Sequence, residues 1–562
     1  MEASPARVIE YFNGEKQNLI PLFQRPYTWT EANWQILWDD LMVQYEADDA
    51  GAHFMGAIVS VPARAIPVGV SKYLIIDGQQ RLTTVSILLC ALRDVLDANS
   101  ASRIQEVYLT NRFREPEDTL KFLPTQVDRD AYRAIALDRQ IPESNKGVQI
   151  AAAYHFFKKL LKGKGRDDDA SIDPSKVLST LEQSLQVVMI NLADDDDPYL
   201  IFESLNFKGE PLNQADLVRN YILMRFKHTI SAGGEQERVY EKYWVPLEKM
   251  LTSNLTEFFR HYTMKNGDDI KKGGIYAAIR TRLKLMDSMS EVESEMESMQ
   301  RFGGFYARFL SPESEQVASI RDCLDDIKDI KVTTSYPLLL RLFDARNAGD
   351  LSVADLENCL RLVESLVVRR AVCGVATNAL NKIFLQLAKN FPSTDHFQWL
   401  HRFLSSFSGS GRFPKDAEFA AAFMAQPQYG RGMTRFILCR LEKSFNHKEI
   451  VDLSTTTIEH VLPQTLSNDW RNELGPESEQ IHNTLIHTFG NLTLTGYNSE
   501  LGNLSFIDKK VKLENTHIEL NRWILEQANW QAAEIEHRAK IMLSIASHIW
   551  ISPSDSTANP IT

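Results

Sequence analysis

The chain has 562 residues, of which 44% are hydrophobic and 24% charged, a composition typical of a folded protein of about three or four structural units. Its five cysteines form no CxxC pair, which argues against a disulfide framework and a cysteine-rich zinc site and predicts a cytoplasmic protein. No run of about 18 apolar residues occurs, which argues against a membrane span. The net charge of −12 argues against indiscriminate coating of DNA, but it leaves binding through a local basic surface open.

Residues 1–230 mix short strands with helices. Residues 54–60 and 73–77 are apolar runs that favour buried strands, and residues 185–192 favour another. Residues 81–96 favour a helix that packs on these strands. The pattern predicts an α/β domain, whose strand order the sequence leaves open.

Trp29, Trp34 and Trp38 invite a role in base stacking, but Trp34 and Trp38 fall on one face of a predicted helix, so core packing is favoured. Further along the chain, Asn206 lies in a tight loop. A helix is expected to follow this loop, with Asn213 as its N-terminal cap.

The predicted strand at 73–77 ends in Asp77 and Gly78, a pair that favours a tight turn, and a helix is expected to open directly after it. The free N–H groups of a helix start attract phosphate, and a glycine lets the backbone approach a ligand closely. Arg81 and Arg25 are candidate donors to a phosphate. Asp77 is alternatively a ligand of a metal or of an attacking water. An ordinary turn with an ion-paired surface arginine is the competing interpretation, and no Walker loop is present.

Residues 231–440 have the periodicity of a nearly all-helical region. Within it the segment 367–374 (VVRRAVCG) is conspicuous, but the sequence gives it no role.

A strand–loop–strand–helix pattern follows within residues 441–550. Residues 455–458 are rich in β-branched side chains and favour a strand, which Pro463 should end. Residues 491–495 alternate as a second strand, and a helix is expected to begin near Asn498. The segment therefore predicts a ββα unit.

Three polar residues of this unit fit the hydrolysis of a phosphodiester bond. The reaction needs a base that deprotonates water, and a neutral imidazole at His460 would supply it. It also needs a hard divalent cation, Mg²⁺ or Mn²⁺, for which Glu459 and Asn498 offer oxygen ligands. Because neighbouring strand residues point to opposite faces, Glu459 and His460 can serve together only if the strand ends or twists beside them.

The order of an acidic residue, His, a nearby Pro, an Asn that opens a strand and a later Asn resembles the HNH, or ββα-metal, nuclease motif. By this resemblance His460 is the general base and Asn491 orients the histidine loop. Glu459 and Asn498 would hold the metal. Two features depart from the motif: Glu459 replaces the usual aspartate, and about thirty residues separate His460 from Asn491. The competing interpretation is a buried, hydrogen-bonded histidine with asparagines that form turns.

Four other basic residues near the motif are expected to have no catalytic role. His482 and His487 are interpreted as surface or core residues. Lys509 and Lys510 are interpreted as solvated side chains, with contact to phosphate as the alternative.

Three N-terminal segments, IPLFQRPYTW at 20–29, IIDGQQRLTT at 75–84 and IFESLNFKGEPL at 201–212, accompany this motif. Together they resemble the GmrSD family of modification-dependent restriction enzymes, with relatives in phosphorothioate-sensing and BREX-associated defence. The resemblance covers both ends of the chain strongly and the helical middle weakly.

The resemblance implies an N-terminal ParB/sulfiredoxin-like domain that binds or hydrolyses a nucleoside triphosphate, GTP or ATP. The nucleotide site is then expected to be formed by Arg25, Asp77, Gly78, Gln79, Gln80, Arg81, Thr83 and Asn206.

The sequence thus predicts a multidomain α+β protein: a sensing domain at 1–230, a helical connection at 231–440, an HNH domain at 441–550 and a disordered tail at 551–562. We expect an antiphage endonuclease that is regulated by nucleotide and cuts or nicks modified foreign DNA, with homo-oligomerisation left open. One alternative is a nucleotide-regulated, non-specific nickase or toxin. Another is a nucleotide-dependent DNA-binding module whose nuclease has decayed.

Overall fold

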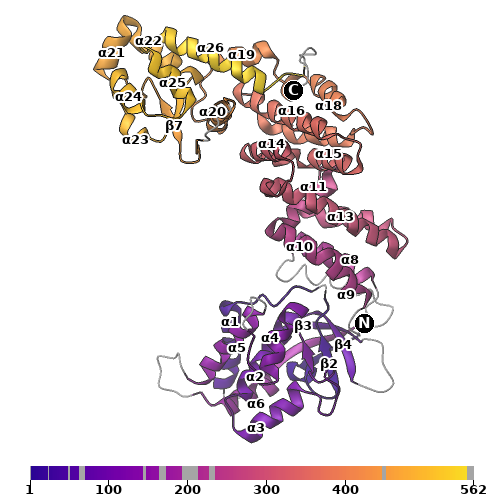
Figure 1. Cartoon of the computed structure of the whole chain (residues 1–562). Helices are drawn as coiled ribbons and strands as arrows, with labels where there is room; N and C mark the ends of the chain where they lie inside the picture. The colour runs from indigo at the N-terminus through magenta and orange to yellow at the C-terminus, as the bar shows by residue number, and fades with distance from the viewer. Residues whose placement is uncertain are drawn as a thin grey trace. The chain divides into compact units, whose positions relative to one another are not determined.

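The computed structural model describes residues 2–22, 24–47, 51–62, 70–142, 147–163, 172–192, 213–226, 234–445 and 451–553 (Figure 1). The chain divides into two compact units, Met1–Pro246 with Tyr276–Glu297, and Leu247–Ile275 with Ser298–Thr562. Because the first unit has a mixed sheet and the second is mainly helical, the multidomain α+β class is confirmed. The boundaries at 230 and 440 stay predictions. None of the described helices has the length and apolar character needed to cross a lipid bilayer.

The sheet of the first unit has the order β1-β6-β3-β4-β2-β5. Its strands are β1 (Glu2–Arg7), β2 (Lys16–Leu19), β3 (His53–Pro62), β4 (Ser71–Asp77), β5 (Phe122–Leu123) and β6 (Leu185–Asn191). The pairs β1–β6 and β3–β4 are antiparallel, whereas β3–β6, β2–β4 and β2–β5 are parallel. The three predicted strands are confirmed as β3, β4 and β6, which are neighbours in this sheet.

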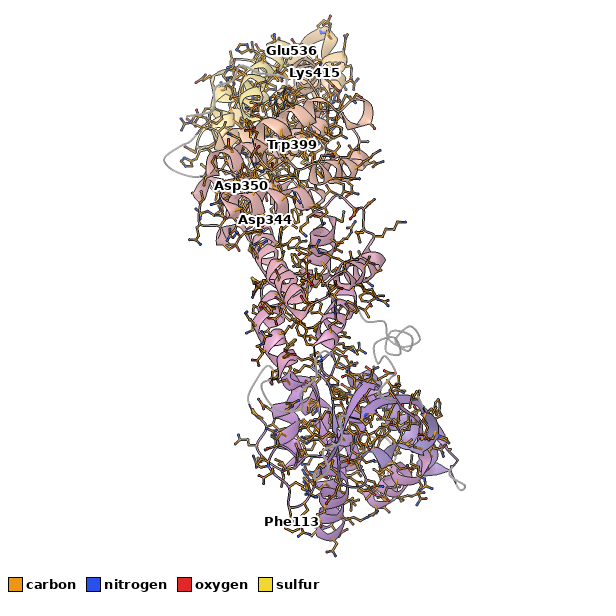
Figure 2. The ribbon with its side chains drawn as sticks, turned by 90° about the vertical axis from the view of Figure 1, so that its right-hand side faces the viewer. Phe113, Asp344, Asp350, Trp399, Lys415 and Glu536 are labelled. Atoms are coloured by element: carbon orange, nitrogen blue, oxygen red, sulfur yellow. The ribbon has the colours of Figure 1, made fainter. Side chains whose placement is uncertain are left out.

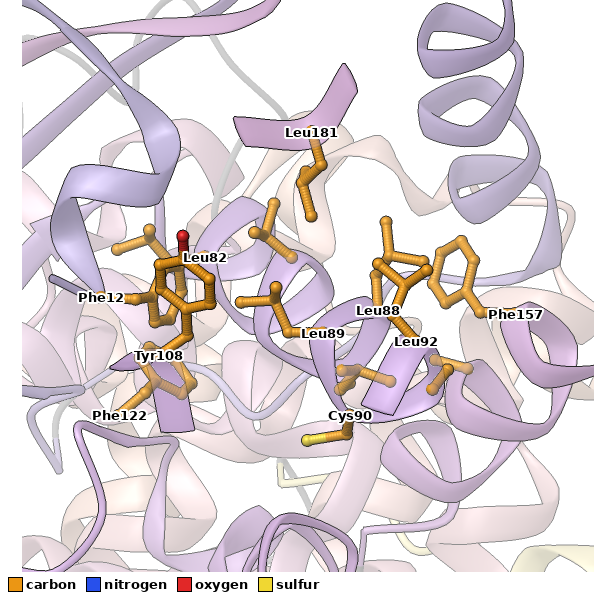
Figure 3. Packing of buried hydrophobic residues seen from close by; sticks show 14 of the residues in the cluster. Phe12, Leu82, Leu88, Leu89, Cys90, Leu92, Tyr108, Phe122, Phe157 and Leu181 are labelled. Atoms are coloured by element: carbon orange, nitrogen blue, oxygen red, sulfur yellow. The ribbon is translucent and has the colours of Figure 1, made fainter. Parts of the chain in front are cut away.

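Helix α2 (Gln79–Arg93) follows β4 through one glycine and is buried along its length. Gly78 has a φ of 86°, and a Cβ there would lie 2.8 Å from Cγ1 of Ile58, so the turn requires glycine. Figure 3 shows how the helix packs in the core of the unit. The residues labelled there include Leu82, Leu88, Leu89 and Leu92 of α2, with Phe12, Phe122 and Phe157. The helix predicted at 81–96 is confirmed, and it begins two residues earlier.

Helix α1 (Glu31–Glu46) packs on α5 (Val148–Leu161) through aromatic rings. Trp34 and Trp38 are both 4% exposed, and their ring centroids lie 5.6 Å from Phe156 and 6.3 Å from Phe157. The preference for core packing over base stacking is therefore confirmed.

Further helices of this unit are η1 (Val8–Tyr11), α3 (Ala98–Ile104), η2 (Gln105–Leu109), α4 (Gln126–Ala136), α6 (Pro174–Ser184), α8 (Gln214–Arg225) and α9 (Glu235–Val239). Asn213 caps α8 as expected, since its Oδ1 accepts a hydrogen bond from N of Asp216 at 2.9 Å.

Residues 234–445, which the structure describes without a gap, contain no strand, so the predicted helical region is confirmed. Figure 2 marks this region by Asp344, Asp350 and Trp399. Its longer helices are α10 (Val245–Leu251), α11 (Leu255–Met264), α12 (Ile275–Lys284), α13 (Met289–Leu310), α14 (Ala318–Asp329), α15 (Tyr336–Ala348), α16 (Val353–Val372), α17 (Leu380–Lys389), α18 (His396–Ser405), α19 (Asp416–Ala425) and α20 (Thr434–Lys443).

The segment 367–374 at the end of α16 joins the helical region to the C-terminal helix. Arg369 Nε donates a hydrogen bond to the carbonyl oxygen of Trp550 at 2.6 Å. Nearby on α16, Glu364 Oε1 accepts one from the indole Nε1 of Trp550 at 2.9 Å. All three side chains are buried, so Arg369 and Glu364 anchor Trp550, the residue that directly follows the helix Ala532–Ile549.

The C-terminal part is built on an antiparallel hairpin of β7 (Thr457–His460) and β8 (Leu492–Thr495). Glu459 lies opposite Thr493, and His460 lies opposite Leu492. Between the strands lie α21 (Asn468–Leu474), α22 (Ser478–Leu485) and η11 (Phe489–Asn491), and after them α23 (Asn498–Leu501), α24 (Phe506–Leu513), α25 (Glu519–Glu526) and α26 (Ala532–Ile549). The predicted ββα unit is confirmed, with the α-helices α21 and α22 and short 3-10 turns inserted between its strands.

The segment that leads into β8 lies so close to α26 that Gly490 has no room for a side chain. A Cβ on Gly490 would lie 2.2 Å from the backbone oxygen of Ile535. From the next turn of α26, Arg538 donates hydrogen bonds to the carbonyl oxygens of Phe489, Gly490 and Leu492 at 3.2, 2.9 and 2.7 Å. Complete burial of this guanidinium lowers its pKa to about 9. Helix α26 thus fixes the segment that leads into β8.

We expect Gly490→Ala to lower the free energy of unfolding of the C-terminal unit by about 3 kcal/mol, the upper end of the usual cost of overpacking. The added methyl group would meet rigid helix backbone, not the end of a flexible side chain. The measurement is denaturant unfolding of the full chain. The matched control is Gly496→Ala on the same hairpin, where nothing lies within 4 Å of the new Cβ. Equal stability of the two variants would contradict this packing.

Candidate functional site

The imidazole of His460 lies at the end of β7 in a cluster of rings. Its Nε2 is 3.1 Å from Nδ1 of His487. The ring of Tyr429 stands edge-on to His460, with 4.3 Å between centroids, and stacks on His487 with 13° between the ring planes. His460 is 4% exposed and Tyr429 is 39% exposed, so the cluster reaches the surface through the tyrosine.

His460 is held in its neutral form. Its pKa is lowered to about 3, chiefly by burial and also by the nearby His487, Lys509 and His482. An imidazole with this pKa carries no proton on one of its nitrogens near neutral pH, so it is able to accept one.

The carboxylate of Glu459 lies beside a buried ammonium group. Its Oε1 is 2.6 Å from Nζ of Lys509, which also donates a hydrogen bond to the carbonyl oxygen of His460 at 2.7 Å. Burial raises the pKa of Glu459, while the positive charge of Lys509 acts in the opposite direction. Lys509, on α24, is 1% exposed, so the prediction of a solvated lysine is wrong. It orients Glu459 and the strand end together.

Both the oxygen and the nitrogen of the fully buried Asn491 amide form hydrogen bonds with neighbouring groups. Its Oδ1 accepts hydrogen bonds from N of Leu462 at 2.7 Å and from Nε1 of Trp530 at 3.0 Å. Its Nδ2 donates to the carbonyl oxygens of Leu462 and Ile486, both at 2.9 Å. The amide therefore pins the backbone two residues beyond His460, which is a positioning geometry.

The hard-oxygen donors of this site match the chemistry of Mg²⁺ or Mn²⁺ but form only part of a ligand set. Glu459 offers a carboxylate that an incoming ion has to share with Lys509. Asn498 begins α23, which packs against β7, but its side chain lies outside the described residues. Within the described part of the chain, no three His, Cys, Asp or Glu side chains converge as a cation site.

Two residues of the site, His487 and Lys509, carry no local sequence signal. His487 was expected to be a surface or core residue, and it lies four positions before Asn491 in the segment that enters β8. Only the register of the hairpin, which places this segment beside the end of β7, indicates its position. His482 faces a different partner: its Nε2 donates a hydrogen bond to the carbonyl oxygen of Pro463 at 2.9 Å.

In the N-terminal unit, Asp77 and Arg81 flank the turn into α2. Nη2 of Arg81 is 3.8 Å from Oδ2 of Asp77, while Nη1 donates a hydrogen bond to the carbonyl oxygen of Met55 at 2.8 Å. A Cβ on Gly56 would lie 2.1 Å from this Nη1, so a glycine on β3 is what admits the guanidinium. Both side chains stay partly exposed, at 28% for Asp77 and 23% for Arg81.

Gln79 and Gln80 fasten the loop that carries Arg25 to the start of α2. Gln79 Nε2 donates a hydrogen bond to Oε1 of Gln24 at 3.0 Å. Gln80 Oε1 accepts one from N of Thr28 at 2.9 Å. Both glutamines are buried and committed to the loop, so they position Arg25 relative to the turn.

The other two predicted members of this site are Thr83 and Asn206, and the structure describes only Thr83. The hydroxyl of Thr83 donates a hydrogen bond to the carbonyl oxygen of Gln79 at 2.7 Å and is buried. Asn206 lies outside the described residues.

The two ends of the chain match known restriction endonuclease domains. Residues 8–223 match the family model described as the GmrSD restriction endonuclease, N-terminal domain, and residues 413–545 match the GmrSD restriction endonucleases, C-terminal domain. No curated protein matches the chain. The matched regions define a restriction endonuclease, a DNA-cutting enzyme of phage defence, and DNA is therefore a partner.

The two matches together span more than half of the chain, in the order of the family's own domains, and the chain belongs to the GmrSD restriction endonuclease family. The resemblance seen in the sequence motifs is thereby confirmed.

Proposed function

We propose that the chain is a metal-dependent HNH endonuclease that is regulated by a nucleoside triphosphate and cuts or nicks modified foreign DNA. The observation that carries the proposal is the arrangement of side chains at the end of β7. There a neutral imidazole, His460, and a carboxylate, Glu459, adjoin a loop that Asn491 fixes.

His460 acts as the general base on water. With a pKa of about 3 it is a weak base in the resting protein, although it is in the correct protonation state. A bound phosphodiester would bring negative charge beside the ring and so raise this pKa. Asn491 acts through the backbone of Leu462, which it holds by two hydrogen bonds.

Glu459 and Asn498 are the residues that would hold Mg²⁺ or Mn²⁺. The ion, when bound, supplies positive charge for the phosphoryl oxygens and for the leaving oxygen. Lys509 keeps the carboxylate of Glu459 in place through its ion pair of 2.6 Å, so the ligand is oriented before an ion arrives.

The nucleotide, GTP or ATP, binds in the N-terminal unit at the turn from β4 into α2. Gly78 brings the backbone close to a ligand there, and Arg81 and Arg25 supply positive charge for phosphates. Asp77 is the candidate ligand of a metal or of the attacking water. The support is the buried framework of Gln79 and Gln80, which holds the Arg25 loop against this turn.

We expect Arg81→Ala and Asp77→Ala each to abolish nucleotide hydrolysis and to change the rate of DNA cleavage. A hundredfold change in cleavage requires about 2.7 kcal/mol of differential binding between two states, which a few charge-assisted phosphate bonds can supply. The measurement is both rates for each variant, with and without nucleotide. Arg112→Ala is the matched control, since Arg112 is 62% exposed on the same unit. Cleavage at the parent rate under every nucleotide condition, despite lost hydrolysis, would show that the two activities are independent.

Cleavage of plain and modified phage DNA by the purified chain, with Mg²⁺ and nucleotide, tests the proposed function. Preferential cleavage of the modified DNA is the expected result. Equal cleavage of both would favour the non-specific nickase or toxin instead. Binding without cleavage of either DNA would overturn the enzymatic proposal and favour the nucleotide-dependent binding module.

A further inference from the structure

The two ring nitrogens of His460 have different surroundings. Nε2 pairs with Nδ1 of His487 at 3.1 Å. Nδ1 of His460 takes part in none of the hydrogen bonds assigned to the described residues. A single proton lies between the two facing nitrogens, and its position decides which nitrogen of His460 carries a free lone pair.

Only one of the two arrangements leaves a usable base. If His487 donated from Nδ1, Nε2 of His460 would be occupied as an acceptor, and Nδ1 of the neutral ring would carry the proton. If His460 instead donates from Nε2, its Nδ1 has the free lone pair. In that case Nδ1 can take a proton from water, while Nε2–H stays bonded to His487.

We propose that His487 is a positioning residue that accepts the Nε2–H bond of His460 and thereby makes Nδ1 the proton-accepting atom. This inference rests on the proposed function of His460 as the base. When Nδ1 takes the proton of the attacking water, the ring becomes an imidazolium, and its Nε2–H remains bonded to Nδ1 of His487.

His487 is itself held firmly enough to do this. Its carbonyl oxygen accepts a hydrogen bond from N of Gln428 at 2.7 Å, and Gln428 is 1% exposed. The ring of Tyr429 stacks on the ring of His487, with centroids 5.5 Å apart. Backbone and ring of His487 are thus both fixed by one segment that follows α19, and this fixes the direction of the acceptor nitrogen.

Two substitutions of His487 distinguish the effect of its acceptor nitrogen from the effect of its aromatic ring. His487→Asn keeps an acceptor, because Oδ1 of asparagine takes the place of Nδ1 of histidine. His487→Phe keeps the stack with Tyr429 but removes the acceptor. We expect His487→Phe to lower kcat about 10–100-fold with little change in KM, as is usual when a partner that orients a reacting group is lost. His487→Asn should recover most of this loss.

The tautomer is read independently of activity from the ¹⁵N shifts of the full chain labelled at histidine, with the His460 signals assigned by comparison with His460→Ala. We expect a protonated Nε2 in the parent and in His487→Asn, and a mixture of tautomers in His487→Phe. Parent-like kcat and an unchanged tautomer in His487→Phe would overturn the inference, even if His460→Ala is inactive. Normal cleavage by His460→Ala would instead overturn the proposed function, whatever the tautomer.

Discussion

Replacing His460 with alanine is expected to lower the rate of DNA cleavage by about 10²–10⁴-fold, the usual contribution of a positioned base. The imidazole is neutral chiefly because burial lowers its pKa to about 3, so the substitution removes the side chain that we assign as the proton acceptor. Nucleotide hydrolysis, which we assign to the other unit, should not change. The measurement is the single-turnover rate on one DNA substrate.

The matched control for this substitution is His517→Ala, an exposed histidine in the same C-terminal part of the chain. It should cut DNA at the parent rate. Unfolding midpoints of both variants within a few degrees of the parent would show that the fold is intact. Near-normal cleavage by the His460 variant would remove this residue from the mechanism.

Removal of divalent ions with EDTA is expected to stop cleavage completely, and added Mg²⁺ or Mn²⁺ should restore it without refolding. The ion would neutralise the phosphoryl charge and hold the leaving oxygen, so its removal would take away both contributions. Glu459 would meanwhile stay in its ion pair with Lys509, so the loss of the ion need not disturb the fold. The measurement is the cleavage rate across a titration of each ion.

Thermal unfolding in EDTA separates a catalytic ion from a structural one. The C-terminal part is held by two apolar clusters, one around Phe489, Leu492 and Trp550 and one around Leu462 and Trp530. We therefore expect the same unfolding midpoint with and without EDTA. A C-terminal part that unfolds on chelation would reveal a structural metal, which the scattered cysteines argue against.

Local patterns in the sequence predicted the elements that carry the site. The β-branched run before Glu459, the alternation after Asn491 and the Asp77–Gly78 pair after an apolar run each have a direct backbone consequence. The structure has strands at β7 and β8 and a glycine-dependent turn before α2, where these patterns place them.

Contacts made over long sequence distances escaped prediction, because they depend on tertiary packing. Lys509 is fifty residues from Glu459, and its solvated appearance in the sequence KKVK gave no sign that α24 would bury it. Gln79 and Gln80 looked like the open start of a phosphate site. Their side chains instead hold the loop at 24–29, which only the packed unit reveals.

The central claim, a metal-dependent nuclease centre on the β7–β8 hairpin, is tested most directly by locating the ion. Fe²⁺ substituted for Mg²⁺, with ascorbate and peroxide, generates radicals that cut the protein backbone close to the bound ion, and the fragments identify the position. We expect cuts near Glu459 and Asn498, which Glu459→Gln should weaken and excess Mg²⁺ should suppress. Cuts confined to the N-terminal unit around Asp77, with none at the hairpin, would contradict it.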